Sequence, residues 1–227
     1  APPGGLAAQD GPGAILFTRA TVVFPAAIHF VAGVDAAPDA IARATLTVAQ
    51  AGETLFISEM DDAGYELRAS DAYTEVIVTW ALDHPPYPRA FAPLAYEWSV
   101  ETGEGDVSAA SGEVVVVDPR FEWRTAGEPP LTLHWHNDRL NGAGIRAELE
   151  PVLTALREYT GREPKFEFAI YDPGAPLCPP VTDPDTGESV TGVVSPETEQ
   201  IFDCSAAQHA RAYEPAGVLF VQRPSLG

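Results

Sequence analysis

Hydrophobic residues change their spacing near Asp118, and this change divides the 227-residue chain into two parts. Before Asp118, apolar and polar residues alternate in short runs, which is the pattern of strands with one buried face. After it, one stretch carries apolar residues three and four positions apart, which is the pattern of a helix. A chain of this length suits two domains of about 110 residues each.

Seven short strands are predicted in the first part, with turn-forming residues between them. They cover residues 15–24, 27–34, 41–50, 54–59, 73–82, 94–101 and 113–117, and a polar turn is expected at 102–110. The alternation puts Trp80 and Trp98 on inward faces. This pattern is typical of an antiparallel β-sandwich of the immunoglobulin or fibronectin type, which we expect over residues 14–118 after a flexible tail of residues 1–13.

The second part is predicted to be a small α+β domain over residues 119–227. Its expected elements are strands at 131–136, 165–171 and 216–222, and a helix at 146–159 that Gly161 ends. A long insertion rich in Pro, Asp and Gly, residues 172–207, separates the last two strands. Because only one helix is available to cover the sheet, we expect an incomplete domain with an open edge and an apolar face.

The composition excludes several classes of partner. The chain carries 33 acidic and 13 basic residues, which gives a net charge of −20 at pH 7. Such a charge repels nucleic acid and anionic lipid surfaces, so neither is an expected partner. No run of 18 apolar residues occurs, so no membrane insertion is predicted. The first five residues are small and resemble an end left after removal of a signal peptide, which predicts a secreted or cell-surface protein.

Two cysteines, Cys178 and Cys204, stand 26 positions apart in the insertion. A disulfide in an exported protein and two buried thiols in a cytosolic protein are both compatible with this count. The loop-like sequence around the two residues favours the disulfide, because neither lies in an apolar run.

Two places have the residue types of a metal site. His134 and His136 flank Trp135 on a predicted strand, so they share one face and would bind a metal if a third ligand joined them. The expected arrangement is the simpler one, a solvent-facing histidine pair with Trp135 buried. Asp183 and Asp185 begin a sequence like a calcium loop, but the later positions lack the required Gly and Glu, so an acidic turn is expected there. No complete set of catalytic or cofactor-binding residues is found.

Five segments carry a resemblance to a known group of proteins, namely residues 96–101, 117–123, 131–136, 166–171 and 212–221. In these segments and their order the chain resembles bacterial secreted proteins of the peptidase MA-like (gluzincin-type) group. In that group an immunoglobulin-like domain precedes a zinc metallopeptidase domain, so the resemblance implies a zincin-like second domain. The zinc site of the group is an H-E-x-x-H helix that follows the strand corresponding to residues 217–221. None of the five histidines here is followed by Glu, so no catalytic residue is carried over.

Two functions remain as hypotheses. The first is a non-catalytic extracytoplasmic interaction or structural protein, whose open sheet is covered by a partner protein or by a second copy of the chain. The second is the front part of a secreted zinc metallopeptidase whose H-E-x-x-H helix lies beyond Gly227. We favour the first, which needs no cofactor. The second requires zinc in a longer product, and calcium at Asp183 and Asp185 is a minor alternative.

Overall fold

A computed structural model describes residues 13–24, 26–62, 64–82 and 85–171, together with three short strands at 181–182, 189–190 and 219–222. The described chain is mainly β, as predicted, with antiparallel sheets and one α-helix. It divides into two compact units, Ala1–Asp118 and Pro119–Gly227, called the first and second unit below. Within the described residues, no helix is both long enough and apolar enough to cross a membrane.

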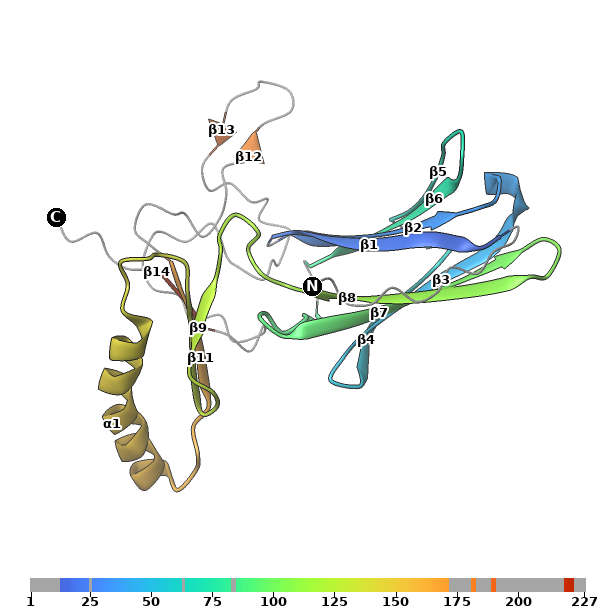
Figure 1. Cartoon of the computed structure of the whole chain (residues 1–227). Coiled ribbons are helices and arrows are strands. Elements are labelled where there is room, and N and C mark those ends of the chain that lie inside the picture. Colours follow the sequence, from blue (N-terminus) through green and yellow to red (C-terminus); the bar gives the residue numbers. More distant parts are fainter. Residues whose placement is uncertain are drawn as a thin grey trace. The chain divides into compact units, whose positions relative to one another are not determined.

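The described residues of the first unit form two four-stranded antiparallel sheets (Figure 1). One sheet has the strand order β1 (Ile15–Val23), β2 (Ala27–Val34), β6 (Thr74–Ala81) and β5 (Tyr65–Ala69). The other has the order β4 (Glu53–Glu59), β3 (Ile41–Gln50), β7 (Pro93–Thr102) and β8 (Val107–Val115), and a short 3-10 helix, Pro38–Ala40, precedes β3.

The core of the first unit is built from the alternate residues that the sequence pattern placed inward. Phe30 on β2 and Leu46 on β3 are fully buried. Trp98 on β7 is also fully buried, and Trp80 on β6 is 4% exposed, so the inward placement of both tryptophans is confirmed. Trp80 stacks on Phe56 of β4, with ring centroids 5.0 Å apart. Burial of such large aromatic surfaces is a main source of stability for a domain of this size.

Two predictions about the first unit are wrong. The described residues of this unit form eight strands rather than seven, because β5 pairs with β6 although its sequence, YELRA, alternates too weakly to be recognised. The last strand begins at Val107 rather than at residue 113, so part of the expected polar turn is strand. Small residues there pair with β7, and the buried hydroxyl of Ser108 donates to the carbonyl oxygen of Gly13 at 2.7 Å. In both segments the local strand propensity is weak, and pairing with a neighbouring strand makes them strands.

The second unit contains a four-stranded sheet with the order β14 (Leu219–Gln222), β11 (Phe166–Tyr171), β10 (Leu131–Trp135) and β9 (Arg124–Ala126). The first three of these strands are parallel, and β9 is an antiparallel edge strand that was not predicted. Two further short strands, β12 (Val181–Thr182) and β13 (Ser189–Val190), pair with each other inside the predicted insertion.

The helix of the second unit, α1 (Gly142–Thr160), begins four residues before the predicted start. The earlier start follows from a cap at Asn141, whose side-chain oxygen accepts a hydrogen bond from the backbone N–H of Gly144 at 3.0 Å. Its end agrees with the prediction, since Gly161 takes a left-handed conformation, φ 65°, and its N–H donates to the carbonyl of Arg157.

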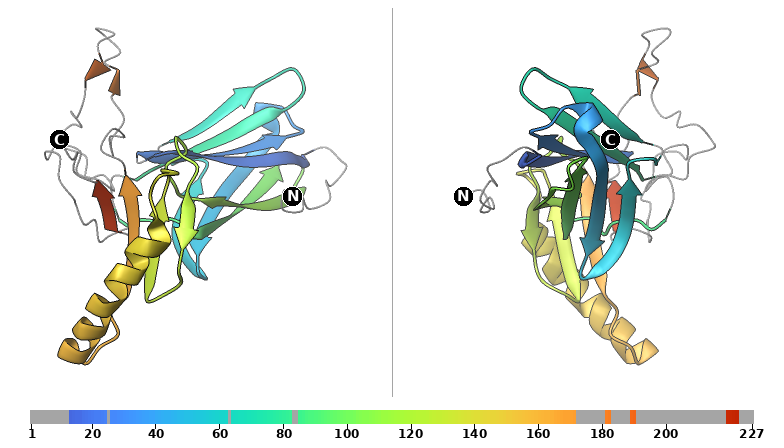
Figure 2. Two further views of the ribbon diagram at one scale, coloured as in Figure 1. Left: turned by 60° about the vertical axis from the view of Figure 1, so that its left-hand side comes forward. Right: turned by 90° about the vertical axis from the view of Figure 1, so that its right-hand side faces the viewer.

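Helix α1 lies along one face of the sheet and packs mainly on β10 and β9 (Figure 2). The core there is formed by Leu131, Leu133 and Trp135, and four residues of the helix and its approach pack against it: Leu140, Ile145, Leu149 and Leu153. The apolar side chains of β11 on the same face, Phe166, Phe168 and Ile170, are only partly buried. One helix therefore covers this face of the sheet incompletely.

Candidate functional site

Three polar side chains on neighbouring strands are connected by hydrogen bonds on the sheet face opposite α1. Thr125 on β9 pairs in register with His134 on β10, and the Thr125 Oγ1 atom lies 2.9 Å from His134 Nδ1. His134 Nε2 lies 2.7 Å from Oε1 of Glu167, which comes from β11. Alternation along β10 places His134 on the face opposite Leu133 and Trp135, which pack toward α1. We call Thr125, His134 and Glu167 the polar relay.

The chemistry of the three groups assigns the protons when the imidazole is neutral. A carboxylate can only accept hydrogen bonds, so Nε2 of His134 must donate to Glu167. Nδ1 of the same ring is then an acceptor, and the hydroxyl of Thr125 donates to it. The side chains of His134 and Glu167 are 5% and 11% exposed, whereas Thr125 is an exposed residue. The relay therefore runs from a buried carboxylate to a hydroxyl that solvent reaches.

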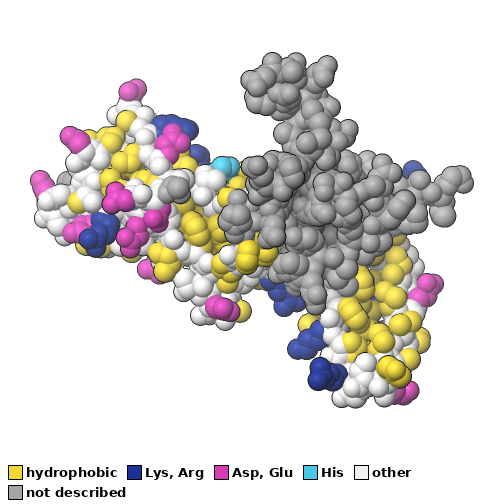
Figure 3. Space-filling view, turned by 180° about the vertical axis from the view of Figure 1, so that it is seen from behind, with side chains coloured by type: hydrophobic (Ala, Val, Ile, Leu, Met, Phe, Trp, Pro, Cys, Tyr) yellow, Lys and Arg dark blue, Asp and Glu magenta, His cyan; other side chains and the backbone are white. Residues whose placement is uncertain are grey.

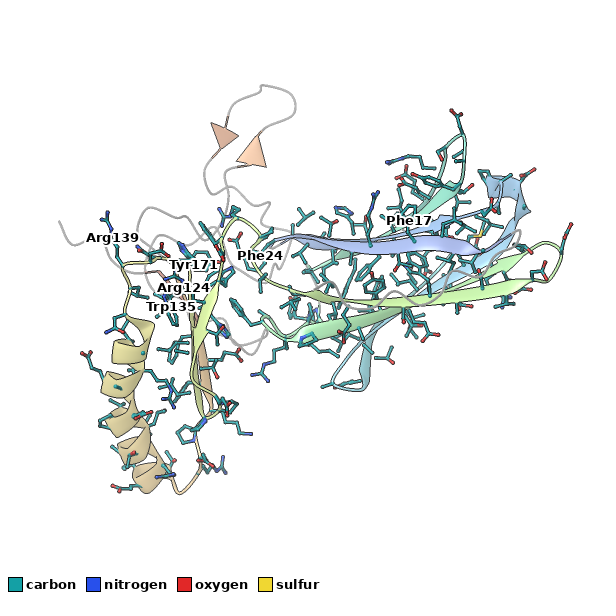
Figure 4. All side chains as sticks on the ribbon, viewed as in Figure 1. Phe17, Phe24, Arg124, Trp135, Arg139 and Tyr171 are labelled. Atoms are coloured by element: carbon teal, nitrogen blue, oxygen red, sulfur yellow. The ribbon has the colours of Figure 1, made fainter. Side chains whose placement is uncertain are left out.

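A group of four rings lies on the same sheet face, made of Phe121, Trp123, His136 and Tyr171. His136 stacks on Phe121 with centroids 3.9 Å apart, and Trp123 meets the edge of Tyr171 at 5.1 Å. The guanidinium carbon of Arg120 lies 5.1 Å from the centroid of Phe121. Figure 4 labels Tyr171 of this group and also Trp135, whose side chain belongs to the other face. We call the four rings the aromatic cluster.

The prediction for the histidine pair is partly wrong. Trp135 is buried, at 9% exposed, as expected, but His134 is buried as well, at 4%, and is not solvent-facing. The interior accepts the imidazole because both of its nitrogens are hydrogen-bonded, which offsets the loss of contact with water. His136 is half-buried within the aromatic cluster. Among the described residues, no group of three His, Cys, Asp or Glu is arranged to hold a metal ion.

The other candidate residues lie outside the described residues. They are Cys178 and Cys204, predicted to form a disulfide, and Asp183 and Asp185, the calcium alternative. Both statements stay predictions.

A cavity of about 220 Å³ opens beside α1, on the side of the sheet that the helix covers. Its floor includes Leu131 and Leu153, and its rim carries Arg146 and Arg157. Each arginine has an acidic partner on the rim, Glu150 at 2.9 Å from Arg146 and Glu163 at 3.7 Å from Arg157. An apolar floor inside a charged rim suits contact with a protein segment.

Sequence reasoning did not find the polar relay. The alternation predicts which face His134 occupies, but nothing local shows that Glu167, 33 positions later, lies on the neighbouring parallel strand. The short strand that carries Thr125 was not predicted at all. The one signal in the sequence was the histidine itself. His134 stands between Leu133 and Trp135 in a strand, and its polar side chain needs a hydrogen-bond partner if its own face of the sheet is buried.

Comparison of the sequence with known protein families gives no match, and no curated protein matches it.

Proposed function

We propose that this chain is an extracytoplasmic interaction or structural protein, secreted or at the cell surface, and that it serves as a subunit of a larger assembly. The observation that carries the proposal is an exposed apolar stripe on α1. Val152 is 53% exposed, Leu156 is 36% exposed and Tyr159 is 90% exposed. We call these three residues the α1 apolar surface.

The stripe continues the buried side of the helix outward. Residues 149, 152, 153, 156 and 159 recur at three- and four-residue spacing, so they lie on one side of α1. Leu149 and Leu153 pack on the sheet, whereas the side chains of the α1 apolar surface are exposed. Figure 3 shows hydrophobic side chains gathered over this part of the second unit. Exposed apolar residues that adjoin one another are typical of a surface that a partner covers.

The partly buried apolar side chains of β11 support the same proposal. Phe166 and Phe168 stack at 5.9 Å on β11, beside the strand that the helix covers, and both are only partly buried. Together with the α1 apolar surface they offer a partner two aromatic rings and a row of aliphatic side chains. The cavity with its charged rim adjoins this area, because Leu153 contributes to both. An apolar centre with a charged margin is the usual composition of a protein interface.

The first unit supports an adhesive role. Its two sheets, of four strands each, have the orders β1-β2-β6-β5 and β4-β3-β7-β8, which fit an immunoglobulin- or fibronectin-like sandwich. Residues 1–118 contain 17 acidic and four basic residues, so the sequence of this unit carries most of the net negative charge. Fold alone does not establish a function, so the proposal rests on the α1 apolar surface.

A second candidate is the front part of a secreted zinc metallopeptidase of the peptidase MA-like group. The observation that favours it is the β10–α1–β11 order with a further parallel strand, β14. In this candidate the partly buried side chains of β11 would pack against another helix. Reading the gene past the codon for Gly227 tests it. A continuation with H-E-x-x-H within a few tens of residues supports this candidate, and its absence removes it.

The interaction proposal is tested by measuring the size of the full chain in solution over a range of concentrations. We expect sedimentation velocity to show association that Val152→Glu abolishes, because the change places a carboxylate within the α1 apolar surface. Ala147→Glu is the matched control, since it adds the same charge to an exposed position on the opposite side of α1. A stable monomer at all concentrations, with no apolar-dye binding that Val152→Glu reduces, contradicts the proposal.

A further inference from the structure

We propose that Thr125 is a nucleophile activated by His134 and Glu167, and that it accepts an acyl group from an activated ester with an aromatic or apolar substituent. This activity goes beyond the interaction function proposed above. It lies on the sheet face opposite α1, so the two proposals fail independently.

The order of the three groups is that of a nucleophile, a base and an orienting acid. The Thr125 hydroxyl is 2.9 Å from His134 Nδ1, and His134 Nε2 is 2.7 Å from the Glu167 carboxylate. A hydroxyl is a weak nucleophile unless a base takes its proton, and the base works best when a third group holds it in the right tautomer. The carboxylate of Glu167 keeps the proton on Nε2, so Nδ1 is the ring nitrogen that accepts the proton of Thr125.

Burial divides the roles among the three residues. His134 and Glu167 are almost fully buried on two central strands, so packing holds their geometry. Thr125 is exposed on β9, the edge strand of the sheet in the described chain, so a substrate can reach its hydroxyl. Backbone N–H groups of an antiparallel strand point alternately toward its partner and away from it. In the proposed activity, those on the outer side of β9 serve as the donors for the oxyanion.

The aromatic cluster indicates the class of substrate. Trp123 is two residues before Thr125, just before β9 begins, and His136 is two residues after His134, just after β10 ends, so both rings lie close to the relay. Phe121 and Trp123 are only half-buried, so their rings present apolar surface to solvent. An aromatic or apolar group of an ester packs on such surface while its carbonyl carbon meets the hydroxyl.

The proposed step is balanced within the site. The Thr125 oxygen attacks the carbonyl carbon of the ester, and the hydroxyl proton moves to Nδ1 of His134. The bond from carbonyl carbon to the leaving oxygen breaks, and the leaving alcohol or phenol carries away the electron pair and receives the proton from His134. The product is an acyl ester on Thr125, which water hydrolyses by the same transfers in reverse. Glu167 is a positioning residue, since it acts only through the imidazole.

The same hydrogen bonds would be present if the polar relay only stabilised the packing of three strands. A structural role and a catalytic role are therefore distinguished by the reactivity of Thr125. The probe is p-nitrophenyl acetate, whose aryl group suits the aromatic cluster. The full chain is incubated with it, release of p-nitrophenolate is followed, and the acetyl group is located by peptide mass spectrometry. We expect acetylation of Thr125 about a hundredfold faster than that of Thr132, a partly buried threonine on the same face that has no imidazole partner among the described residues.

Four variants complete the test. Thr125→Val removes the burst of p-nitrophenolate, Thr125→Ser retains it, and Glu167→Gln slows acylation at least about tenfold while Thr125 stays the acceptor. Thr132→Val leaves the rate unchanged. An acetyl group found only on Lys165 or the terminal amine overturns the proposal, as does equal labelling of Thr125 and Thr132. If Thr125→Val does not fold, Thr125→Ser provides the test, because the absence of an acetyl group on that serine also overturns the proposal.

Discussion

Replacing Tyr65 by phenylalanine is expected to stabilise the first unit. Tyr65 begins β5, and its hydroxyl is buried with no hydrogen-bond partner among the residues the structure describes. Burial of this kind costs about 1–3 kcal/mol, because the hydroxyl loses water and gains nothing. Phenylalanine keeps the ring and removes the unsatisfied atom. We therefore expect the free energy of unfolding at pH 7 to rise by about 1 kcal/mol, and the melting temperature by roughly 5 °C.

The same residue makes stability depend on alkaline pH. Desolvation by burial raises the pKa of Tyr65 well above its ordinary value of 10.0. Below pH 10 the phenol is protonated in both folded and unfolded chains, so it has no effect on the pH dependence there. As pH rises above 10, the unfolded chain releases the proton first, and stability is lost until the pH reaches the raised pKa of the folded state. Because Tyr65 is only half-buried, screening by solvent limits the loss to about 1 kcal/mol at pH 11.

The measurement is urea unfolding of wild type and Tyr65→Phe at pH 7 and pH 11, followed by circular dichroism. The advantage of the variant should grow from about 1 kcal/mol at pH 7 to about 2 kcal/mol at pH 11. Tyr73→Phe is the control, because its edge-on contact with Phe17, at 5.3 Å, is kept by phenylalanine. A Tyr65→Phe protein less stable than wild type at pH 7, or a difference independent of pH, refutes the reasoning.

Two glycine substitutions test side-chain packing, one in each unit. Gly142→Ala should destabilise the second unit by about 1–3 kcal/mol in thermal unfolding, because the new Cβ would press on the buried Trp135 ring. Alanine normally favours a helix over glycine, so a variant more stable than wild type contradicts this prediction. Gly33→Ala should cost about 1 kcal/mol in urea unfolding, because the new methyl displaces the Phe17 ring from Tyr73. In a Phe17→Ala background that cost should nearly disappear, and a cost that persists shows that Phe17 is not the obstacle.

Much of the strand content follows from local pattern. In β3, β6 and β7 the alternate apolar residues are the buried ones, as Leu46 and Trp98 illustrate, whereas in β2 Val31 of the opposite face is buried as well. The helix and its end at Gly161 were also predictable, because spacing and stop signals are properties of adjacent residues. The mainly β composition was predictable for the same reason.

Other features required the tertiary structure. β5 and the first half of β8 have weak strand patterns and exist because β6 and β7 offer them hydrogen-bonding partners. The exposure of Val152 and Tyr159 depends on where α1 crosses the sheet, which the period of the helix does not specify.

The sequence by itself determined where strands and the helix form and which of their faces are apolar, since these depend on residues a few positions apart. Only the tertiary structure decided that Thr125, His134 and Glu167 meet, because each comes from a different strand and their contact depends on strand order and direction. Strand pairing is a long-range choice among surfaces of similar pattern, and the local sequence carries little information about it.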